Sequence, residues 1–216
     1  MPESAIQPVL TDLDLESLAA EVVALAMKAG ASDAEAVARE GDEFSVKVRM
    51  GQVETLKESG SRALGLRVFL GKRSASTSTS DLTAEGIRQL VDGALALAKV
   101  TEEDPFAGLP ESGEFGALPG DLHLFDEDVY SLPGLERIEW ARRAEEAALA
   151  ADPRIVNSDG GSFEAATGRK ALANSRGFVG GYRTSYAGVS ASPLAQDADG
   201  QMQCVPERTL GKSLEE

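Results

Sequence analysis

The 216-residue sequence predicts an α+β fold with antiparallel strands. Apolar residues recur at helical spacing near 14–29, 87–98 and 131–151, and they alternate with polar residues in the segments between. Glycine-containing turns divide those segments at hairpin spacing. Because helices stand apart from hairpin-connected strands and do not alternate with single strands, a doubly wound parallel sheet is not expected.

Three segments have the 3.6-residue period of amphipathic helices. The second and third helical faces comprise Ile87, Leu90, Val91, Ala94, Leu95 and Ala98, and Leu135, Ile138, Ala141 and Leu149. The expected start and stop signals are, in chain order, Thr11 or Asp12, Gly30, Asp81 or Thr83, Pro133, and Asp152–Pro153.

The segments between the helices have the two-residue period of half-buried strands. In the first half we expect strands over 44–50, 53–59, 64–70 and 74–80, with turns at Gly51–Gln52 and Gly71–Lys72. In the second half we expect strands over 155–164, 170–175 and 178–191, with turns at Thr167–Arg169 and Ser175–Gly177. Each half therefore has the order of a helix followed by an antiparallel meander, without a repeat in the sequence itself.

Composition changes between the two halves of the chain. Residues 101–130 hold three prolines and many acids and have no periodicity, as expected for an acidic linker. We therefore expect an N-terminal α/β domain over 1–100, this linker, a second α/β domain over 131–203, and a mobile tail over 204–216.

Charge and composition exclude several classes of protein. The chain has 36 acids and 21 bases, a net charge of −15, which argues against direct binding of nucleic acid or anionic lipid. The sequence has no basic and apolar leader, and its longest strongly apolar run, 22–27, is too short to span a membrane, so we expect a cytoplasmic protein. The single cysteine, Cys204, excludes an internal disulfide, and the single histidine, His123, excludes a metal site of several imidazoles.

A search for catalytic residues finds no complete site. His123 has no second histidine one helical turn away, and the chain has no Gly-x-Ser-x-Gly segment to supply a nucleophilic serine. Cys204 has no histidine-bearing segment to activate its thiol. We therefore predict no catalytic and no metal-ligating residue, and binding residues are left unknown.

Other patterns permit binding but favour structural roles. Residues 158–162, Ser-Asp-Gly-Gly-Ser, resemble a phosphate loop without its Gly-Lys-Ser/Thr ending, so a tight turn or bulge is expected. Residues 74–80 could bind an anion at the following helix, but Asp81 favours capping there. The acidic clusters 102–104 and 126–128 lack the spacing of an EF-hand, which favours a solvated linker.

Five larger side chains also permit a role in binding. Arg62 and Arg67, near the strands, could bind a carboxylate. Trp140, on the third predicted helix, is expected to be a residue of the hydrophobic core. Tyr182 and Tyr186 share one strand face, where packing explains them better than stacking on a ligand.

Several sequence segments together resemble the PmbA/TldD family. In the first half these are residues 51–54 (GQVE), 64–69 (LGLRVF) and 74–82 (SASTSTSDL). In the second half they are 101–109 (TEEDPFAGL), 152–155 (DPRI) and 172–178 (LANSRGF), which resemble the PmbA (TldE) branch and not the TldD branch. The resemblance covers about residues 14–203. The chain departs from this branch at 204–207, where a basic, aromatic stretch is usual.

The resemblance implies a two-subunit metallopeptidase that acts on unfolded proteins or peptides, and the family's older name is modulator of DNA gyrase. Its zinc-binding His-Glu-x-x-x-His helix belongs to the TldD branch, so the resemblance implies no metal in this chain, zinc in a TldD-like partner, and no activity for this chain alone. It also implies an N-terminal α/β region followed by a mainly β C-terminal domain. Because the sequence stops at Glu216, we expect a fragment or a naturally short product.

These points predict the noncatalytic N-terminal portion of a PmbA/TldE-like subunit, which contributes to subunit assembly and to a chamber for peptide substrates. Antiparallel meanders provide edges with which an extended peptide can pair. The alternative is a stand-alone acidic interaction module: an adaptor, an inhibitor or a DNA mimic directed at gyrase. Acids mixed with bases disfavour the mimic, and a small-molecule sensor would need a convergent polar pocket.

Overall fold

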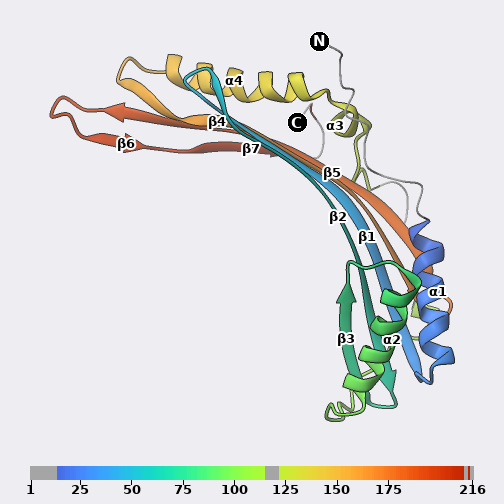
Figure 1. Ribbon diagram of the computed structural model, residues 1–216. Coiled ribbons are helices and arrows are strands. Elements are labelled where there is room, and N and C mark those ends of the chain that lie inside the picture. The colour runs from blue at the N-terminus through green and yellow to red at the C-terminus, as the bar shows by residue number, and fades with distance from the viewer. Residues whose placement is uncertain (1–13, 115–121, 212–213, 215–216) are drawn as a thin grey trace. The chain divides into compact units, whose positions relative to one another are not determined.

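The computed structural model describes residues 14–114, 122–211 and 214, and it confirms the α+β class (Figure 1). The helices are α1 (Leu15–Lys28), α2 (Ala84–Ala98), α3 (Glu127–Ser131) and α4 (Gly134–Ala150), with a 3-10 turn at Ser112–Glu114. The strands are β1 (Asp33–Arg49), β2 (Gln52–Leu70), β3 (Arg73–Thr79), β4 (Ile155–Asn174), β5 (Val179–Gln196), β6 (Met202–Cys204) and β7 (Glu207–Gly211). None of the helices in these described ranges is long and apolar enough to cross a bilayer.

The described strands form one sheet in the order β3-β2-β1-β4-β5-β6, and β7 also pairs with β5. The strands predicted in the first half of the sequence and those predicted in the second half fit this order as two adjacent groups. They meet where β1 lies beside β4. The predicted mobile tail is wrong for Glu207–Gly211, which pair with Ala187–Ala191 of β5.

Several strands are longer than the sequence predicts. The predicted turn at Thr167–Arg169 is wrong, because β4 runs through it without interruption. β1 begins at Asp33, well before the predicted start at 44, because Ala34, Ala36 and Ala38 alternate inward and are fully buried. Alanine is depleted in strands, so its alternation gave no strand signal.

The helix caps differ in part from those expected. Thr11 and Asp12 lie outside the described residues, and Asp14 caps α1 by accepting from the N–H groups of Glu16 and Ser17, each at 3.1 Å. Of the two candidates, Asp81 and Thr83, it is Thr83 that caps α2, because its Oγ1 accepts from the N–H of Gly86 at 3.1 Å.

The chain forms two compact units, each assembled from separate segments. Unit 1 comprises Met1–Gly41, Gly60–Asp121 and Arg169–Tyr182; unit 2 comprises Asp42–Ser59, Leu122–Gly168 and Arg183–Glu216. The division into 1–100, 101–130, 131–203 and 204–216 stays a prediction.

The core of unit 1 lies between α1, α2 and the sheet. Leu64, Leu66 and Val68 of β2 and the three buried alanines of β1 face Val22 and Leu90 of the helices. Each fully buried Leu or Val contributes about 1.5–3 kcal/mol. Small β1 side chains leave room for the helices to approach the sheet closely.

The core of unit 2 is built around aromatic side chains. Phe44 of β1 and Phe163 of β4 meet edge to face, with ring centroids 6.5 Å apart. Val129 and Ala141, from α3 and α4, belong to the same buried cluster. Trp140 packs against this cluster while partly buried, which agrees with its predicted core role.

Candidate functional site

His123 and Cys204 do not join any metal-ligating group. His123 is exposed before α3, with a φ of 49°, and Cys204 is exposed in β6. Among the residues described, no group of three or more His, Cys, Asp or Glu side chains could hold a metal ion. The absence of catalytic and metal-ligating residues stays a prediction.

Residues 158–162 lie inside β4 and not in a phosphate loop. Gly160 has a φ of 122° and donates its N–H to the buried Oγ of Ser158 at 2.8 Å. A Cβ on Gly161 would lie 2.3 Å from the carbonyl oxygen of Ala141. Gly161 therefore allows β4 to approach α4, whereas a Cβ on Gly160 would lie 2.8 Å from the carbonyl oxygen of Val48 in β1, so both glycines have packing roles.

The arginines singled out from the sequence pair with carboxylates of the chain itself. Arg67 Nη2 lies 3.0 Å from Glu35 Oε1, and Arg62 Nε lies 3.4 Å from Glu40 Oε2. The Glu40 side chain is fully buried, and Arg169 donates to its other oxygen through Nε at 2.7 Å. A buried carboxylate between two arginines supports a structural role within the protein.

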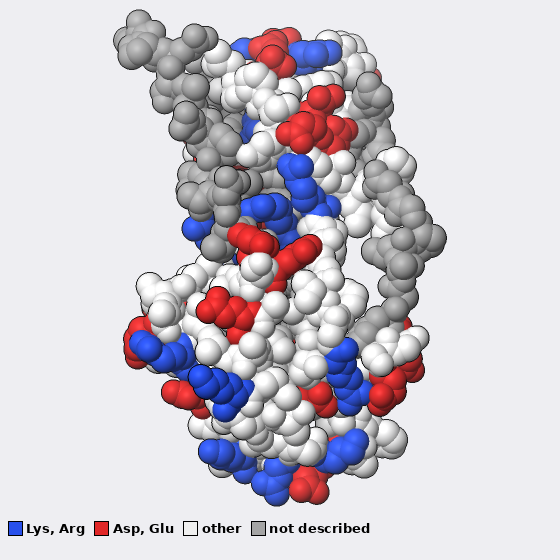
Figure 2. All heavy atoms as spheres, turned by 90° about the vertical axis from the view of Figure 1, so that its right-hand side faces the viewer, with Lys and Arg blue, Asp and Glu red and all other residues white. Residues whose placement is uncertain are grey.

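The acidic clusters also have structural partners. Asp126 caps α3 by accepting from the Asp128 N–H at 2.8 Å, and Glu127 lies 3.5 Å from Arg183. Glu103 lies 3.5 Å from Arg73. Acidic and basic side chains are interspersed on the face shown in Figure 2, without a continuous acidic surface. This mixture does not resemble a row of phosphates.

Residues 172–178, one of the segments behind the family resemblance, comprise the end of β4 and the turn between β4 and β5. Asn174 Oδ1 accepts from two N–H groups of the turn, at 3.0 and 3.1 Å. Ser175 donates its hydroxyl to Asp33 Oδ1 at 2.7 Å, and Arg176 reaches both Asp33 and Glu111. Asp33 raises the pKa of Arg176 above its usual value. This segment therefore ties the turn to the start of β1 in unit 1.

Glu145 of α4 is a buried residue that the sequence analysis missed. It is 1% exposed, and its two oxygens accept from the N–H groups of Met50 and Gly51 at 2.9 and 3.0 Å. Met50 and Gly51 have φ values of 49° and 75°, so the turn lies at 50–51, one residue before the predicted turn. The missed signal was a glutamate one helical turn from Ala141, on the apolar face.

The first half of β2, Gln52–Ser59, presents a bare edge in unit 2. Every residue from Gln52 to Ser59 is exposed. β3 pairs with β2 only over Leu64–Leu70, so no described strand covers the outer edge of Gln52–Ser59. The backbone groups along this edge are available for pairing with another chain.

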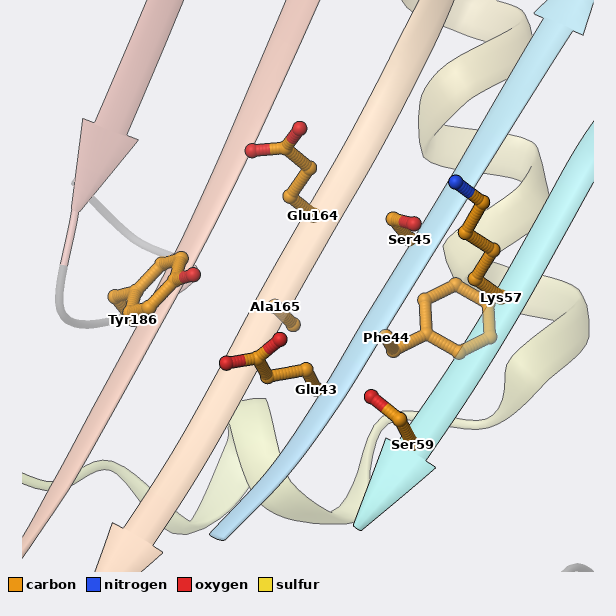
Figure 3. Close-up of a pocket in the computed structure, with 8 residues that line it drawn as sticks. All are labelled: Glu43, Phe44, Ser45, Lys57, Ser59, Glu164, Ala165 and Tyr186. Carbon is orange, nitrogen blue, oxygen red and sulfur yellow. The ribbon is translucent and has the colours of Figure 1, made fainter. Parts of the chain in front are cut away.

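A hollow of about 280 Å³ lies on the face of the unit 2 sheet away from α4, which we name the open face (Figure 3). Its polar lining residues come from four neighbouring strands: Lys57 and Ser59, Glu43 and Ser45, Glu164, and Tyr186. Tyr186 is 40% exposed and Tyr182 is 47% exposed, so both rings are only partly packed, and the packing role stays a prediction. Sequence alone could not find the hollow, because it depends on the pairing of β1 with β4.

Two family models match the chain. The first domain of PmbA/TldA metallopeptidases matches residues 34–98, and the central domain matches 127–211. Metalloprotease PmbA of Escherichia coli O157:H7 is 36% identical over 88% of this chain and 42% of its own length. A PmbA homolog of Haemophilus influenzae is 37% identical over 84% of this chain and 40% of its own length. The chain thus spans about two-fifths of these relatives.

Solved structures share the fold. A protein of Bacteroides thetaiotaomicron described as a modulator of DNA gyrase superposes with a TM-score of 0.83 at 20% identity, covering 93% of this chain and 45% of that one. TldE from Thermococcus kodakarensis superposes with a TM-score of 0.75 at 13% identity, covering 90% and 43%. At these identities the likeness shows the fold alone.

Proposed function

The chain belongs to the PmbA/TldD family of metallopeptidase-related proteins, and from this we propose that it is a noncatalytic portion of a PmbA/TldE-like subunit. In this proposal it assembles with a TldD-like subunit and helps to build the chamber for unfolded proteins or peptides. The observation that carries the proposal is the bare edge at Gln52–Ser59.

An exposed strand edge suits both proposed partners. A strand of another subunit, or an extended peptide, can pair with its N–H and C=O groups without a strong requirement for sequence. The charged side chains of Glu54, Lys57 and Glu58 on this segment hinder indiscriminate edge-to-edge aggregation. The segment therefore combines an open backbone with protection from self-association.

Peptide hydrolysis is assigned to the partner. A catalytic zinc needs about three protein ligands and an open position for water. The residues described in this chain do not fit such a site, because they contain no suitable group of His, Cys, Asp or Glu. We propose that a TldD-like subunit holds the zinc and activates water.

The test mixes this chain with the TldD-type subunit of the same cell and follows cleavage of an unfolded peptide. Each protein alone is the control. Cleavage confined to the mixture is the expected result. If the mixture neither associates nor cleaves, the family role fails for this chain and a stand-alone interaction module takes its place; loss of gyrase supercoiling on adding the chain would identify the gyrase-directed form.

A proline scan over Val53, Glu54, Thr55 and Leu56 tests the edge itself. Adjacent N–H groups of a strand point to opposite sides, so alternate prolines remove outward and inward donors. Prolines that remove N–H groups pointing away from the sheet should leave the stability of the fold nearly unchanged and should weaken assembly or cleavage. Prolines that remove N–H groups pointing into the sheet should destabilise it. If the outward prolines leave both association and cleavage unaltered, the edge has no role in either.

A further inference from the structure

Charges are distributed unevenly in the hollow on the open face of unit 2. Figure 3 shows the carboxylates of Glu43 and Glu164 and the hydroxyl of Tyr186 over β4 and β5, whereas the Lys57 ammonium lies toward β1 and β2. Glu43 forms no ion pair or hydrogen bond with any residue that the structure describes. Its carboxylate therefore has no close cationic partner among the described residues.

Arg208 shows which chemical group fits this end of the hollow. Its Nη2 donates to Glu164 Oε2 at 2.8 Å from β7, the strand on the far side of β5, and its side chain remains 54% exposed. A guanidinium thus already binds one of the two carboxylates. The second carboxylate and the partly exposed ring of Tyr186 remain open to a further cation.

Lys57 occupies the other end of the hollow. It too has no ion pair within the described residues, and its ammonium can donate to a carbonyl or carboxylate oxygen. A peptide with a basic side chain carries both required groups, a cation and nearby carbonyl oxygens. The volume of about 280 Å³ is near the lower limit of small-ligand pockets, so one side chain with its adjoining backbone is the size that fits.

We propose that this hollow binds the cationic side chain of an arginine or lysine in a peptide, with the cation at Glu43 and Tyr186, beside the Glu164–Arg208 ion pair, and a backbone carbonyl at Lys57. The proposed function supplies only the source of the cation, a peptide. The site lies on the sheet face, apart from strand pairing at the bare edge. It would favour basic segments among the peptides that the assembly handles.

The experiment uses the 216-residue chain alone, without a partner subunit. Capped Gly-Arg-Gly is titrated against the isotope-labelled chain while backbone amide shifts are followed by NMR, and capped Gly-citrulline-Gly, which lacks the charge, is the matched probe. The arginine peptide should shift the amides of Ser45, Ser59 and Glu164 with a Kd of about 1 mM. The citrulline peptide should leave them unmoved.

Variants locate the contact. Glu43→Gln should weaken binding of the arginine peptide about three- to tenfold, as expected for the loss of one charge-assisted contact. Glu21→Gln, an equally charge-neutralising change at an exposed position of α1, should bind like the parent chain. Equal shifts with the citrulline peptide, no shifts up to about 10 mM peptide, or unchanged affinity of Glu43→Gln would each overturn the proposal. The cleavage assay of the mixed subunits is independent, so either proposal can fail without the other.

Discussion

The two units differ in how far the edge and the faces of the sheet are covered by other elements. Unit 1 pairs β2 with β3 over Leu64–Leu70 and packs two helices on small alanines, which leaves its share of β2 mostly covered. Unit 2 packs α3 and α4 on aromatic residues, leaves Gln52–Ser59 exposed, and has a polar hollow on its open face. The same strand, β2, is therefore covered by a neighbour in unit 1 and bare in unit 2.

This difference separates the surfaces that stabilise the fold from those available for binding. A bare edge and an uncompensated carboxylate contribute little to folding, because water already satisfies their polar groups. Both features lie in unit 2. We infer that unit 2 carries most of the binding surface of this chain, and the following predictions test that distinction.

The largest expected effect is in the aromatic core of unit 2. Phe163 is 1% exposed, and Phe163→Ala should lower the free energy of unfolding by about 3–5 kcal/mol. Phe106 is 93% exposed, so Phe106→Ala should change it by less than about 0.5 kcal/mol. Denaturant unfolding measures both. A small effect of Phe163→Ala would mean that unit 2 lacks the packed core described.

Replacing a glycine by alanine should change the free energy of unfolding in opposite directions at one position of each unit. In Gly161→Ala of unit 2 the new Cβ meets backbone atoms of Ala141 and Glu145 at 2.3 and 2.7 Å, so unfolding should become easier by about 1–3 kcal/mol. Gly93→Ala of α2 meets nothing within 4 Å and should stabilise the chain by about 0.5–1 kcal/mol. Thermal unfolding of the two variants should show opposite shifts. Shifts of the same sign would contradict the close approach of β4 to α4.

Loss of the buried carboxylate of unit 2 should loosen the β1–β2 turn. Glu145→Ala removes the acceptor of the Met50 and Gly51 N–H groups and should destabilise the chain by about 1–3 kcal/mol. Hydrogen exchange at those two amides should speed up more than elsewhere. Glu146→Ala, one residue along and exposed, is the control and should leave their exchange unchanged.

The smallest effects concern exposed acids. Hydrogen bonds from the guanidinium and the backbone N–H of Arg154 lower the pKa of Asp152 to about 2, and hydrogen bonds from the side chain and backbone of Ser17 lower the pKa of Asp14. Each ionised carboxylate stabilises the fold at a pH above its unfolded pKa of 3.8. That contribution is lost as the pH falls through the lowered pKa of the folded state. NMR titration should show that Arg154→Gln raises the pKa of Asp152 toward 3.8 and leaves that of Asp14 unchanged. An unaltered Asp152 titration would exclude the ion pair as the cause.

The sequence predicts elements well where one periodicity decides them. α1 and α2 follow from their apolar faces, and β3 lies where its hydroxylated run predicts a strand. The turn predicted at residues 167–169 was wrong, because pairing with neighbouring strands, a long-range property, overrides a local turn signal.

The candidate site was less predictable. Glu40 and Glu145 break apolar patterns on β1 and α4, so their burial was detectable in principle. The hollow was not detectable, because it joins residues of β1, β2, β4 and β5 that meet only through the sheet order. The bare edge likewise depends on where β3 stops pairing with β2.

Hydrogen exchange on the mixture with a TldD-type subunit tests the central claim most directly. If the binding surface lies in unit 2, amides of Gln52–Ser59 should become protected when the subunits associate, while those of Leu64–Leu70, already paired with β3, should stay as they were. Association that leaves Gln52–Ser59 exchanging as fast as in the chain alone would contradict the account.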